Sequence, residues 1–120
     1  MDTKPEYSGP DRRRRRVYVT QHHEYHCKDG ICVAVRDVQT GEFIPRHSAV
    51  GKRATGALVL KGAGIESIVP PEAAVPGLRM HFAENVDDPR DVLTSSLKSI
   101  ERPPRDVVAE YDAVASASPR

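Results

Sequence analysis

The chain of 120 residues contains no tryptophan, and only 5 % of it is aromatic, which predicts a small and thinly packed core. It also lacks long apolar segments. The run from Ala57 to Leu60 is far shorter than the roughly 20 residues that span a membrane. The polar N-terminus has no apolar stretch typical of a secretory leader. These features argue against membrane insertion and against secretion by a standard signal peptide.

The sequence also lacks the short motifs of common catalytic and phosphate-binding sites. It contains no Gly-x-Ser-x-Gly, no His-Glu-x-x-His, no Cys-x-x-Cys and no phosphate-cradling glycine loop followed by Lys and Ser or Thr. Its two cysteines, without a secretory leader, fit a reducing compartment. We therefore expect a cytoplasmic protein that is not an enzyme and holds no cofactor.

Charge of one sign is concentrated in one place. The whole chain has a formal net charge of +1, but residues 1–16 contain six basic and three acidic side chains, so that the other 104 residues carry −2. Five of the basic residues form the run Arg12-Arg13-Arg14-Arg15-Arg16. The positive feature of the chain is thus local, and no global field points to nucleic acid or membranes.

Composition along the chain predicts one domain with loose ends. Residues 1–15 form a polar, disordered basic arm, residues 16–115 a single small β-barrel-like domain with a C-terminal helix, and residues 116–120 a disordered tail. Ten prolines and eight glycines favour many turns and short elements over long helices.

Several short segments have the composition of β-strands. Residues 17–27 are rich in Val, Tyr and Thr, and Asp29-Gly30 separates them from an apolar run at 31–35, which predicts a hairpin with a type I′ turn. A second turn at Gly41 lets the chain restart as a strand at Phe43, which makes three consecutive antiparallel strands. Residues 57–60 and 78–82 are predicted as further strands, separated by a proline-rich loop over residues 70–77.

The segment from Val92 to Ile100 has two interpretations. Apolar residues at positions 93, 97 and 100 fit a helix, whereas Thr94-Ser95-Ser96 favours an exposed strand that completes a barrel, and we prefer the strand. Residues 107, 108, 111 and 114 are apolar at helical spacing and predict an amphipathic helix that covers one open end of the sheet. The predicted fold class is mainly β: a small antiparallel barrel or bent sheet of about 5–6 strands with a C-terminal amphipathic helix.

The hairpin brings two cysteines together. With Asp29-Gly30 as the turn, Cys27 faces Cys32 in a non-hydrogen-bonded pair, and the next pairs are His26 with Val33, Tyr25 with Ala34 and Glu24 with Val35. Two buried hydrophobic thiols are the plainer interpretation. The alternatives are a reducible cross-strand disulfide, or a metal site completed by His47 or His81.

The arginine run predicts contact with an anion. Guanidinium groups make bidentate contacts with phosphates, carboxylates and guanine edges, and binding through such a run weakens steeply with salt. The leading hypothesis is a non-enzymatic binding or regulatory module that presents Arg12, Arg13, Arg14, Arg15 and Arg16 to an anionic partner. This partner is an acidic protein surface, a nucleic acid or a nucleotide. A solvated run that keeps the chain soluble, and a structural role in a larger assembly, are the alternatives.

Two segments together resemble the PilZ domains, small β-barrels that bind cyclic di-GMP. In that family an Arg-x-x-x-Arg and an Asp/Asn-x-Ser-x-x-Gly motif grip the dinucleotide. Here Arg12 and Arg16 match the first motif, and Asp37-Val38-Gln39-Thr40-Gly41 is similar to the second, with Gln39 at the serine position and the glycine one residue early. The resemblance covers about thirty residues. It implies that Arg12 and Arg16 contact guanine and phosphate, and that Asp37 lies on the second motif.

Overall fold

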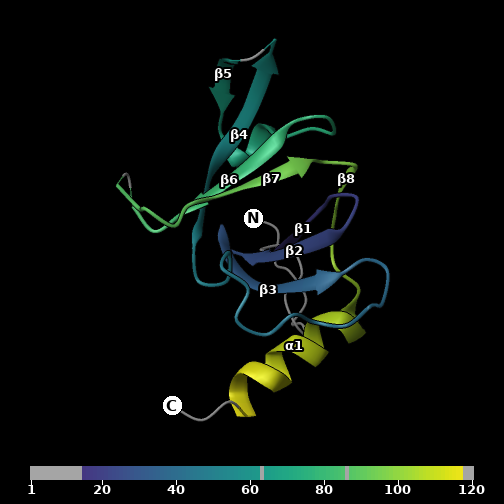
Figure 1. The fold of residues 1–120 in the computed structure, drawn as a ribbon. Coiled ribbons are helices and arrows are strands. Elements are labelled where there is room, and N and C mark those ends of the chain that lie inside the picture. Colours follow the sequence, from purple (N-terminus) through teal and green to yellow (C-terminus); the bar gives the residue numbers. More distant parts are fainter. Residues whose placement is uncertain (1–14, 63, 86, 118–120) are drawn as a thin grey trace, which may run out of the picture.

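The computed structural model describes residues 15–62, 64–85 and 87–117 (Figure 1). Most of the predicted arm, including Arg12, Arg13 and Arg14, lies outside the described residues, as does the end of the predicted tail. The strands are β1 (Arg15–Val19), β2 (His23–Lys28), β3 (Ile31–Asp37), β4 (Arg53–Lys61), β5 (Gly64–Val69), β6 (Arg79–Ala83), β7 (Val92–Ser96) and β8 (Ser99–Glu101), and the helices are a 3-10 turn (Pro71–Ala73) and α1 (Arg105–Ala117). The prediction of a mainly β, antiparallel protein with a C-terminal helix is confirmed.

One bent antiparallel sheet contains all eight strands, in the order β7-β6-β4-β3-β2-β1-β8, with β5 paired to β4. Its narrowest point is between β3 and β4, where the ladder consists of Ile31 opposite Arg53. We call β1, β2, β3 and β8 the helix-covered half, and β4, β5, β6 and β7 the open half. The two halves fold toward one another, as Figure 1 shows.

The sheet is bent and is not closed into a barrel by pairing of its two end strands. β7 and β8 follow one another along the chain, and the two residues between them cross from one end of the sheet to the other. The Leu97 N–H donates to the Leu78 carbonyl over 2.7 Å, and the Lys98 N–H donates to the Val19 carbonyl, also over 2.7 Å. The strand interpretation of residues 92–100 is therefore confirmed, as two strands with different partners.

The first predicted strand, residues 17–27, was wrong as a single element. The chain reverses after Thr20, whose N–H donates to the His23 carbonyl over 2.8 Å and whose hydroxyl bonds the same backbone, so that β1 and β2 pair with each other. Because the Thr20 side chain forms hydrogen bonds with the backbone of the turn, the chain reverses here without a glycine or proline.

The predicted hairpin between β2 and β3 is confirmed at its tip. Asp29 and Gly30 both have positive φ, 53° and 83°, as a type I′ turn requires, and Cys27 lies opposite Cys32. The predicted pairs further from the turn were wrong by one residue, because β3 bulges at Val33. Beyond the bulge the observed partners are His26 with Ala34, Tyr25 with Val35 and Glu24 with Arg36.

The bulge gives β3 two buried faces. Cys32 and Val35 point into the main core, whereas Ala34 points to the opposite face, and Val33 is left partly exposed. A β-bulge places two residues of one strand opposite one of its neighbour and so redirects the side chains that follow it.

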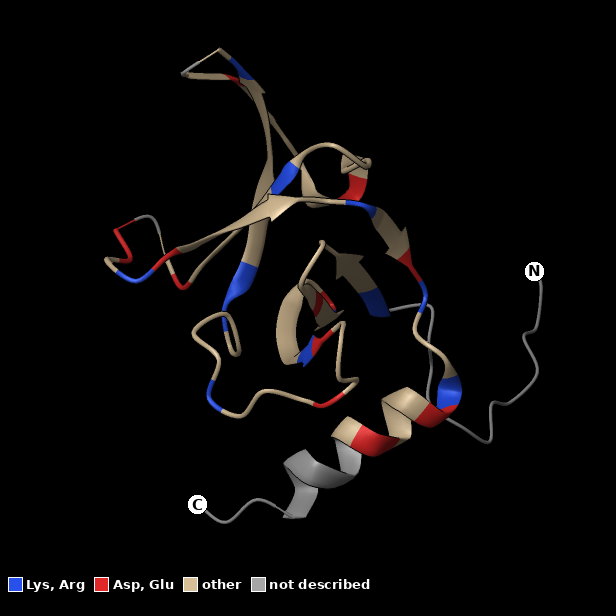
Figure 2. Ribbon diagram, turned by 45° about the vertical axis from the view of Figure 1, so that its right-hand side comes forward, with Lys and Arg blue, Asp and Glu red and all other residues tan. Residues whose placement is uncertain are grey.

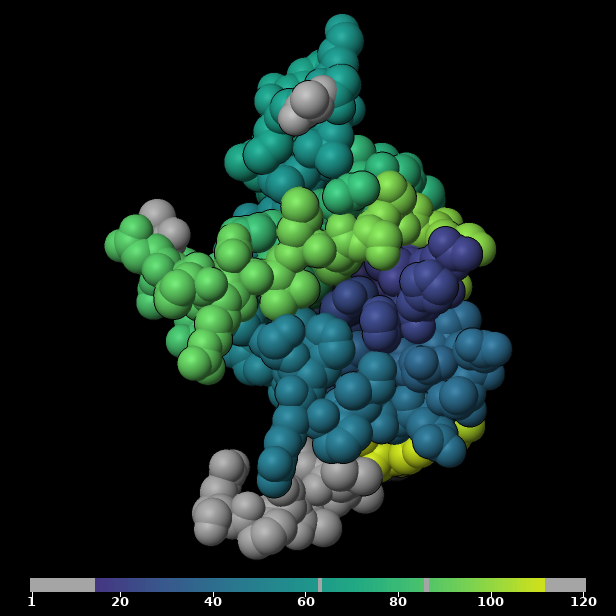
Figure 3. All heavy atoms as spheres, in the orientation of Figure 1, coloured from purple at the N-terminus to yellow at the C-terminus, as the bar shows by residue number. Residues whose placement is uncertain are grey.

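The predicted third strand at Phe43 is reduced to a single bridge with Arg36. A strand that was not predicted, β5, pairs with β4 along a ribbon that stands away from the rest of the protein (Figures 1 and 3). Gly56 is needed at the base of this ribbon. A Cβ at this position would lie 2.9 Å from the Val69 carbonyl oxygen and 3.0 Å from Cγ2 of Ile68.

The main core lies between the two halves. Its largest members include Tyr25 and Phe82, whose rings stack at 5.5 Å across the fold. The remaining buried residues of this cluster are Tyr18, Cys27, Cys32, Val35, Ala49, Ala54, Ala57, Ala74, Met80 and Leu97. Small side chains on β4 let the halves approach closely, which suits a chain with few aromatic residues.

The helix α1 packs on the face of the helix-covered half that points away from this core, through Val107, Val108 and Tyr111. The prediction that it covers an open end of the sheet was wrong in this respect. His26 and Ala34 alternate with the core residues along β2 and β3, so the hairpin offers the helix a second apolar face. None of the helices in the described part of the chain is long and apolar enough to cross a membrane.

Candidate functional site

The strand β1 begins with two basic residues, coloured blue in Figure 2. Strand alternation directs their side chains to opposite faces. Arg15 is 6 % exposed, and its Nη1 donates to the Tyr111 hydroxyl over 3.1 Å, with the guanidinium 5.5 Å from the centre of that ring. Arg16 is exposed. Arg15 thus joins β1 to α1, whereas Arg16 is available to a ligand.

Arg16 lines two adjacent hollows. The larger, of about 390 Å³, lies where the two halves of the sheet meet, and the smaller, of about 260 Å³, lies beside β8. Arg53 is the second arginine of the larger hollow, and Arg102 is a further arginine of the smaller. We call the two hollows together the arginine groove. Its larger part is lined by Arg16, Tyr18, Cys27, Asp29, Gly30, Arg53, Ala54, Pro71 and Glu72, and its smaller part by Arg15, Arg16, Ile100, Glu101 and Arg102.

The deep wall of the larger hollow is neutral. Burial raises the pKa of the Tyr18 phenol, and the neighbouring Cys27 adds to this, while a hydrogen bond with Arg16 opposes it. A hydrogen bond with Cys32, together with burial, raises the pKa of the Cys27 thiol well above its usual range. Phenol and thiol therefore keep their protons near neutral pH, and the charges of the hollow belong to two arginines and two carboxylates.

Asp37 lies far from this groove. On β2 its partner is His23, whereas the partner of Arg16 is Cys27, four residues further along the strand and so about 13 Å away. The Asp37 carboxylate accepts hydrogen bonds from the backbone N–H groups of Gln39, at 2.8 Å, and Thr40, at 2.9 Å. These bonds, that from Thr40 foremost, lower the pKa of Asp37. The structure does not bring Asp37 together with Arg16, and the aspartate organises its own turn.

The two cysteines form the predicted cross-strand pair, and both are buried. Cys32 directs its backbone N–H and carbonyl toward Lys52 and Gly51, away from β2, which makes the pair with Cys27 a non-hydrogen-bonded one. In the described part of the chain, no three His, Cys, Asp or Glu side chains are grouped closely enough to hold a metal ion.

The two histidines considered as further ligands have other partners. The His47 ring packs against His23 and Tyr25, at 5.5 and 5.8 Å between centroids, and its Nδ1 accepts the Ala49 N–H over 3.0 Å. Burial, with His23 nearby, lowers the pKa of His47. His81 lies on the outer face of the open half, away from the core that holds the cysteines.

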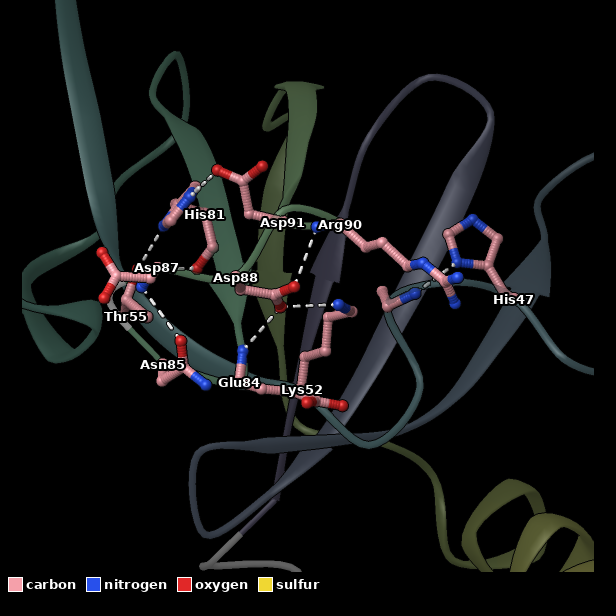
Figure 4. Close-up of polar contacts among 11 residues, drawn as sticks. His47, Lys52, Thr55, His81, Glu84, Asn85, Asp87, Asp88, Arg90 and Asp91 are labelled. Atoms are coloured by element: carbon pink, nitrogen blue, oxygen red, sulfur yellow. Dashed lines mark hydrogen bonds and ion pairs between the residues drawn. The ribbon is translucent and has the colours of Figure 1, made fainter.

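His81 belongs to a polar chain that the sequence did not reveal (Figure 4). Its Nδ1 lies 2.5 Å from the Thr55 hydroxyl, and its Nε2 lies 2.7 Å from an Asp91 carboxylate oxygen. A hydroxyl, an imidazole and a carboxylate in this order are also the groups of hydrolase triads. Here the Thr55 hydroxyl also bonds the His81 carbonyl, at 3.2 Å, and none of the three residues lines the arginine groove.

A second polar contact holds the same loop to the sheet. Lys52 Nζ lies 2.7 Å from the Asp88 carboxylate, which also accepts the backbone N–H groups of Glu84 and Arg90, each over 2.8 Å (Figure 4). The bond with Lys52, followed by those with the two N–H groups, lowers the pKa of Asp88 to about 2. We therefore interpret two sets of contacts as stabilising the loop between β6 and β7: the hydrogen bonds of His81 with Thr55 and Asp91, and the ion pair of Asp88 with Lys52.

Sequence reasoning identified Arg16 but missed Arg53 and Arg102. Neither belongs to a long basic run, and only the meeting of distant strands places them beside Arg16. Comparison of the chain with protein-family models, with curated proteins and with solved structures found no match. Fold and groove define the class: a small, mainly β protein whose bent sheet carries a C-terminal helix on one face.

Proposed function

We propose that this protein is a non-enzymatic binding module that takes an anionic ligand with hydroxyl or amine donors, such as a nucleotide, in the arginine groove. One observation carries this proposal: Arg16, the last residue of the arginine run, lines both hollows, with Arg53 in one and Arg102 in the other. The last residue of the run therefore lies in a preformed depression that is lined by four arginines and three carboxylates.

The lining of the larger hollow supports a nucleotide over a plain polyanion. Two guanidinium groups suit phosphate oxygens, because each presents a fork of N–H donors. Asp29 and Glu72 repel a ligand that is only anionic, but they accept hydrogen bonds from sugar hydroxyls or base amines. A volume of about 390 Å³ lies within the usual range of small-ligand sites.

Calorimetric titration with cyclic di-GMP, GMP and duplex DNA, each at two salt concentrations, tests the proposal. We expect a nucleotide to bind, and Arg16→Ala and Arg53→Ala to weaken it about tenfold or more, since each removes a charged hydrogen-bond donor. Arg90→Ala is the matched control, because Arg90 is exposed and lines neither hollow. Deletion of residues 1–14 measures how much the arm contributes to affinity, and it keeps Arg15, which contacts Tyr111 on α1.

The outcomes separate the possible anions. Binding of cyclic di-GMP that depends on Arg16 supports the proposal, and this protein would then share its ligand with the PilZ domains that it resembles. Binding of DNA alone, lost with the arm and indifferent to Arg53→Ala, contradicts the groove and supports a nucleic-acid partner. If cyclic di-GMP, GMP and DNA all fail to bind, the nucleotide proposal is contradicted. An acidic protein partner and a structural role in an assembly then remain.

A second candidate is a redox pair, favoured by the direct opposition of Cys27 and Cys32. Oxidation by a peroxide joins the two sulfurs, while the two thiol protons and the two electrons convert the peroxide to water and alcohol, or to two waters for hydrogen peroxide. Free thiols counted in denaturant before and after peroxide treatment test this. Two thiols lost without formation of a covalent dimer support the pair, and two retained thiols exclude it.

A further inference from the structure

The ribbon formed by β4 and β5 extends beyond the rest of the sheet. Pairing of β4 with β6 ends at Leu58 opposite Arg79, whereas pairing of β4 with β5 continues to Lys61 opposite Gly64. Among the described strands, β5 pairs with β4 and with no other. Figure 3 shows this ribbon standing clear of the surface around it. A two-stranded ribbon alone is marginally stable in water, so contact with a partner would stabilise this one.

One face of this ribbon is apolar. Cross-strand partners share a face, and the pairs on this one are Leu58 with Ile68 and Leu60 with Ile65. Leu58 is buried, but Leu60, Ile65 and Ile68 are 42, 58 and 64 % exposed. Ile65 and Ile68 are the most exposed large apolar side chains of the described residues. We call these four residues the ribbon face.

The edge of β5 is less suited to pairing than its face. Val59 lies opposite Ser67 and Leu60 opposite Ile65, so Glu66 is an extra residue that bulges from the strand. Bulges and charges on an edge strand discourage the addition of a further strand. A partner therefore gains most by covering the ribbon face with side chains.

The ribbon face has opposite charges at its two ends. Glu66 shares the position opposite Leu60 with Ile65 near the tip, and Arg79 lies at the base, opposite Leu58, whereas Lys61 alternates with Leu60 and points to the other face. Arg79 points outward, because its neighbour Met80 is fully buried in the core. If two ribbons pack face to face and antiparallel, the tip of each lies over the base of the other. Glu66 of each copy then approaches Arg79 of its partner, and the leucines and isoleucines meet between them.

We propose that the ribbon face binds a second copy of this chain and forms a two-fold symmetric dimer. An isologous contact needs a patch that is complementary to itself, and an apolar face with a carboxylate at one end and a guanidinium at the other satisfies this. The dimer is independent of the arginine groove, none of whose lining residues belongs to the ribbon face.

Sedimentation of the full chain over a range of concentrations tests the dimer. We expect the parent to dimerise, and Ile65→Lys and Ile68→Lys each to weaken the dimer by about tenfold or more, because each places a charge in an apolar contact. Val38→Lys is the matched control, since Val38 is 41 % exposed and lies beyond β3 in the helix-covered half. Circular dichroism of each variant verifies that it folds.

A charge exchange tests the orientation of the two copies. Glu66→Arg and Arg79→Glu should each weaken the dimer, and the double variant should recover most of the loss, because both contacts are then restored with their signs reversed. A monomeric parent at the highest soluble concentration overturns the proposal, and so does a dimer that Val38→Lys weakens as much as Ile65→Lys and Ile68→Lys do. A double variant that adds the two single losses overturns the tip-to-base arrangement.

Discussion

The helix-covered half and the open half of the sheet use the same backbone pairing but bury their side chains differently. In the helix-covered half, Tyr25 and Cys27 face the main core, and His26 between them is buried under α1. In the open half, Met80 and Phe82 face the core, but His81 between them lies in a polar chain on the outer face. The helix-covered half is therefore buried on both faces, between the core and α1, whereas the open half is buried on one face only.

This difference separates the positions that stabilise the fold from those that are available to partners. A strand covered on both sides offers a ligand little more than its ends, and the helix-covered half contributes to the arginine groove near the start of β1 and at the turn between β2 and β3. A strand covered on one side offers its whole outer face, and the ribbon face extends along such strands. Substitutions should accordingly have unequal effects on the two faces of the open half and comparable effects on the two faces of the other.

The largest contrast is expected within the open half. Phe82→Ala removes a fully buried ring stacked on Tyr25 and should lower the free energy of unfolding by about 3–5 kcal/mol. Leu93→Ala, on the outer face opposite His81, should change it by less than about 0.5 kcal/mol. Urea unfolding of both variants measures the difference, and equal losses would contradict an open outer face.

On the helix-covered face, Tyr111→Phe keeps the ring and removes the hydroxyl that accepts the Arg15 hydrogen bond. A hydrogen bond to a buried charged group contributes about 1.5–3 kcal/mol, so the free energy of unfolding should fall by that amount. Chemical denaturation gives the value. No loss would show that α1 is held by its apolar contacts alone.

Part of the pH dependence of stability should originate on the same face. Burial lowers the pKa of His26 below that of the unfolded chain, although Glu24, 3.1 Å from its Nε2, opposes the shift. The unfolded chain therefore takes up the proton first, and stability falls as pH decreases from about 6.5 toward the folded pKa. Unfolding curves between pH 7.5 and about 5 should show this decline, and His26→Gln should flatten it. A profile that is equally steep in the variant assigns the decline to other groups.

The smallest effect is expected for the polar chain on the open face. Thr55→Val removes the hydroxyl beside His81 while keeping a β-branched side chain on β4. Because the contact is exposed, the loss should be below about 1 kcal/mol. Thermal unfolding measures it, and a loss as large as that of Phe82→Ala would mean that this chain is a central element of the fold.

Local chemistry made much of the fold predictable. Asp29-Gly30 dictated the hairpin of β2 and β3, and the helical spacing of Val107, Val108 and Tyr111 identified α1 and its buried side. The bulge at Val33 was not predictable, because Cys32, Val33, Ala34 and Val35 are all apolar and give no sign of which one leaves the ladder. The strand β5 was missed because its exposed isoleucines lack the alternation that a half-buried strand shows.

The candidate site was predictable only in part. The run of five arginines identified Arg16 as a candidate. It did not show that Arg15 contacts α1 while Arg16 lines the groove, because the face on which each side chain lies depends on where α1 packs. Arg53 and Arg102 are 37 and 86 residues from Arg16 in the sequence. Arg102 is near Arg16 because β8 pairs with β1, and Arg53 is near it because the sheet bends between its two halves.

The corner between β7 and β8 has a consequence for the order in which the protein can fold. The outer edge of β1 is paired by β8, which begins 80 residues after β1 ends, at Ser99. During synthesis this edge has to wait until residues 99–101 have been made, whereas the hairpin of β2 and β3 can close from local contacts alone. A nascent or truncated chain that stops before Ser99 therefore presents an open strand edge, and the three residues of β8 decide whether β1 is protected from aggregation.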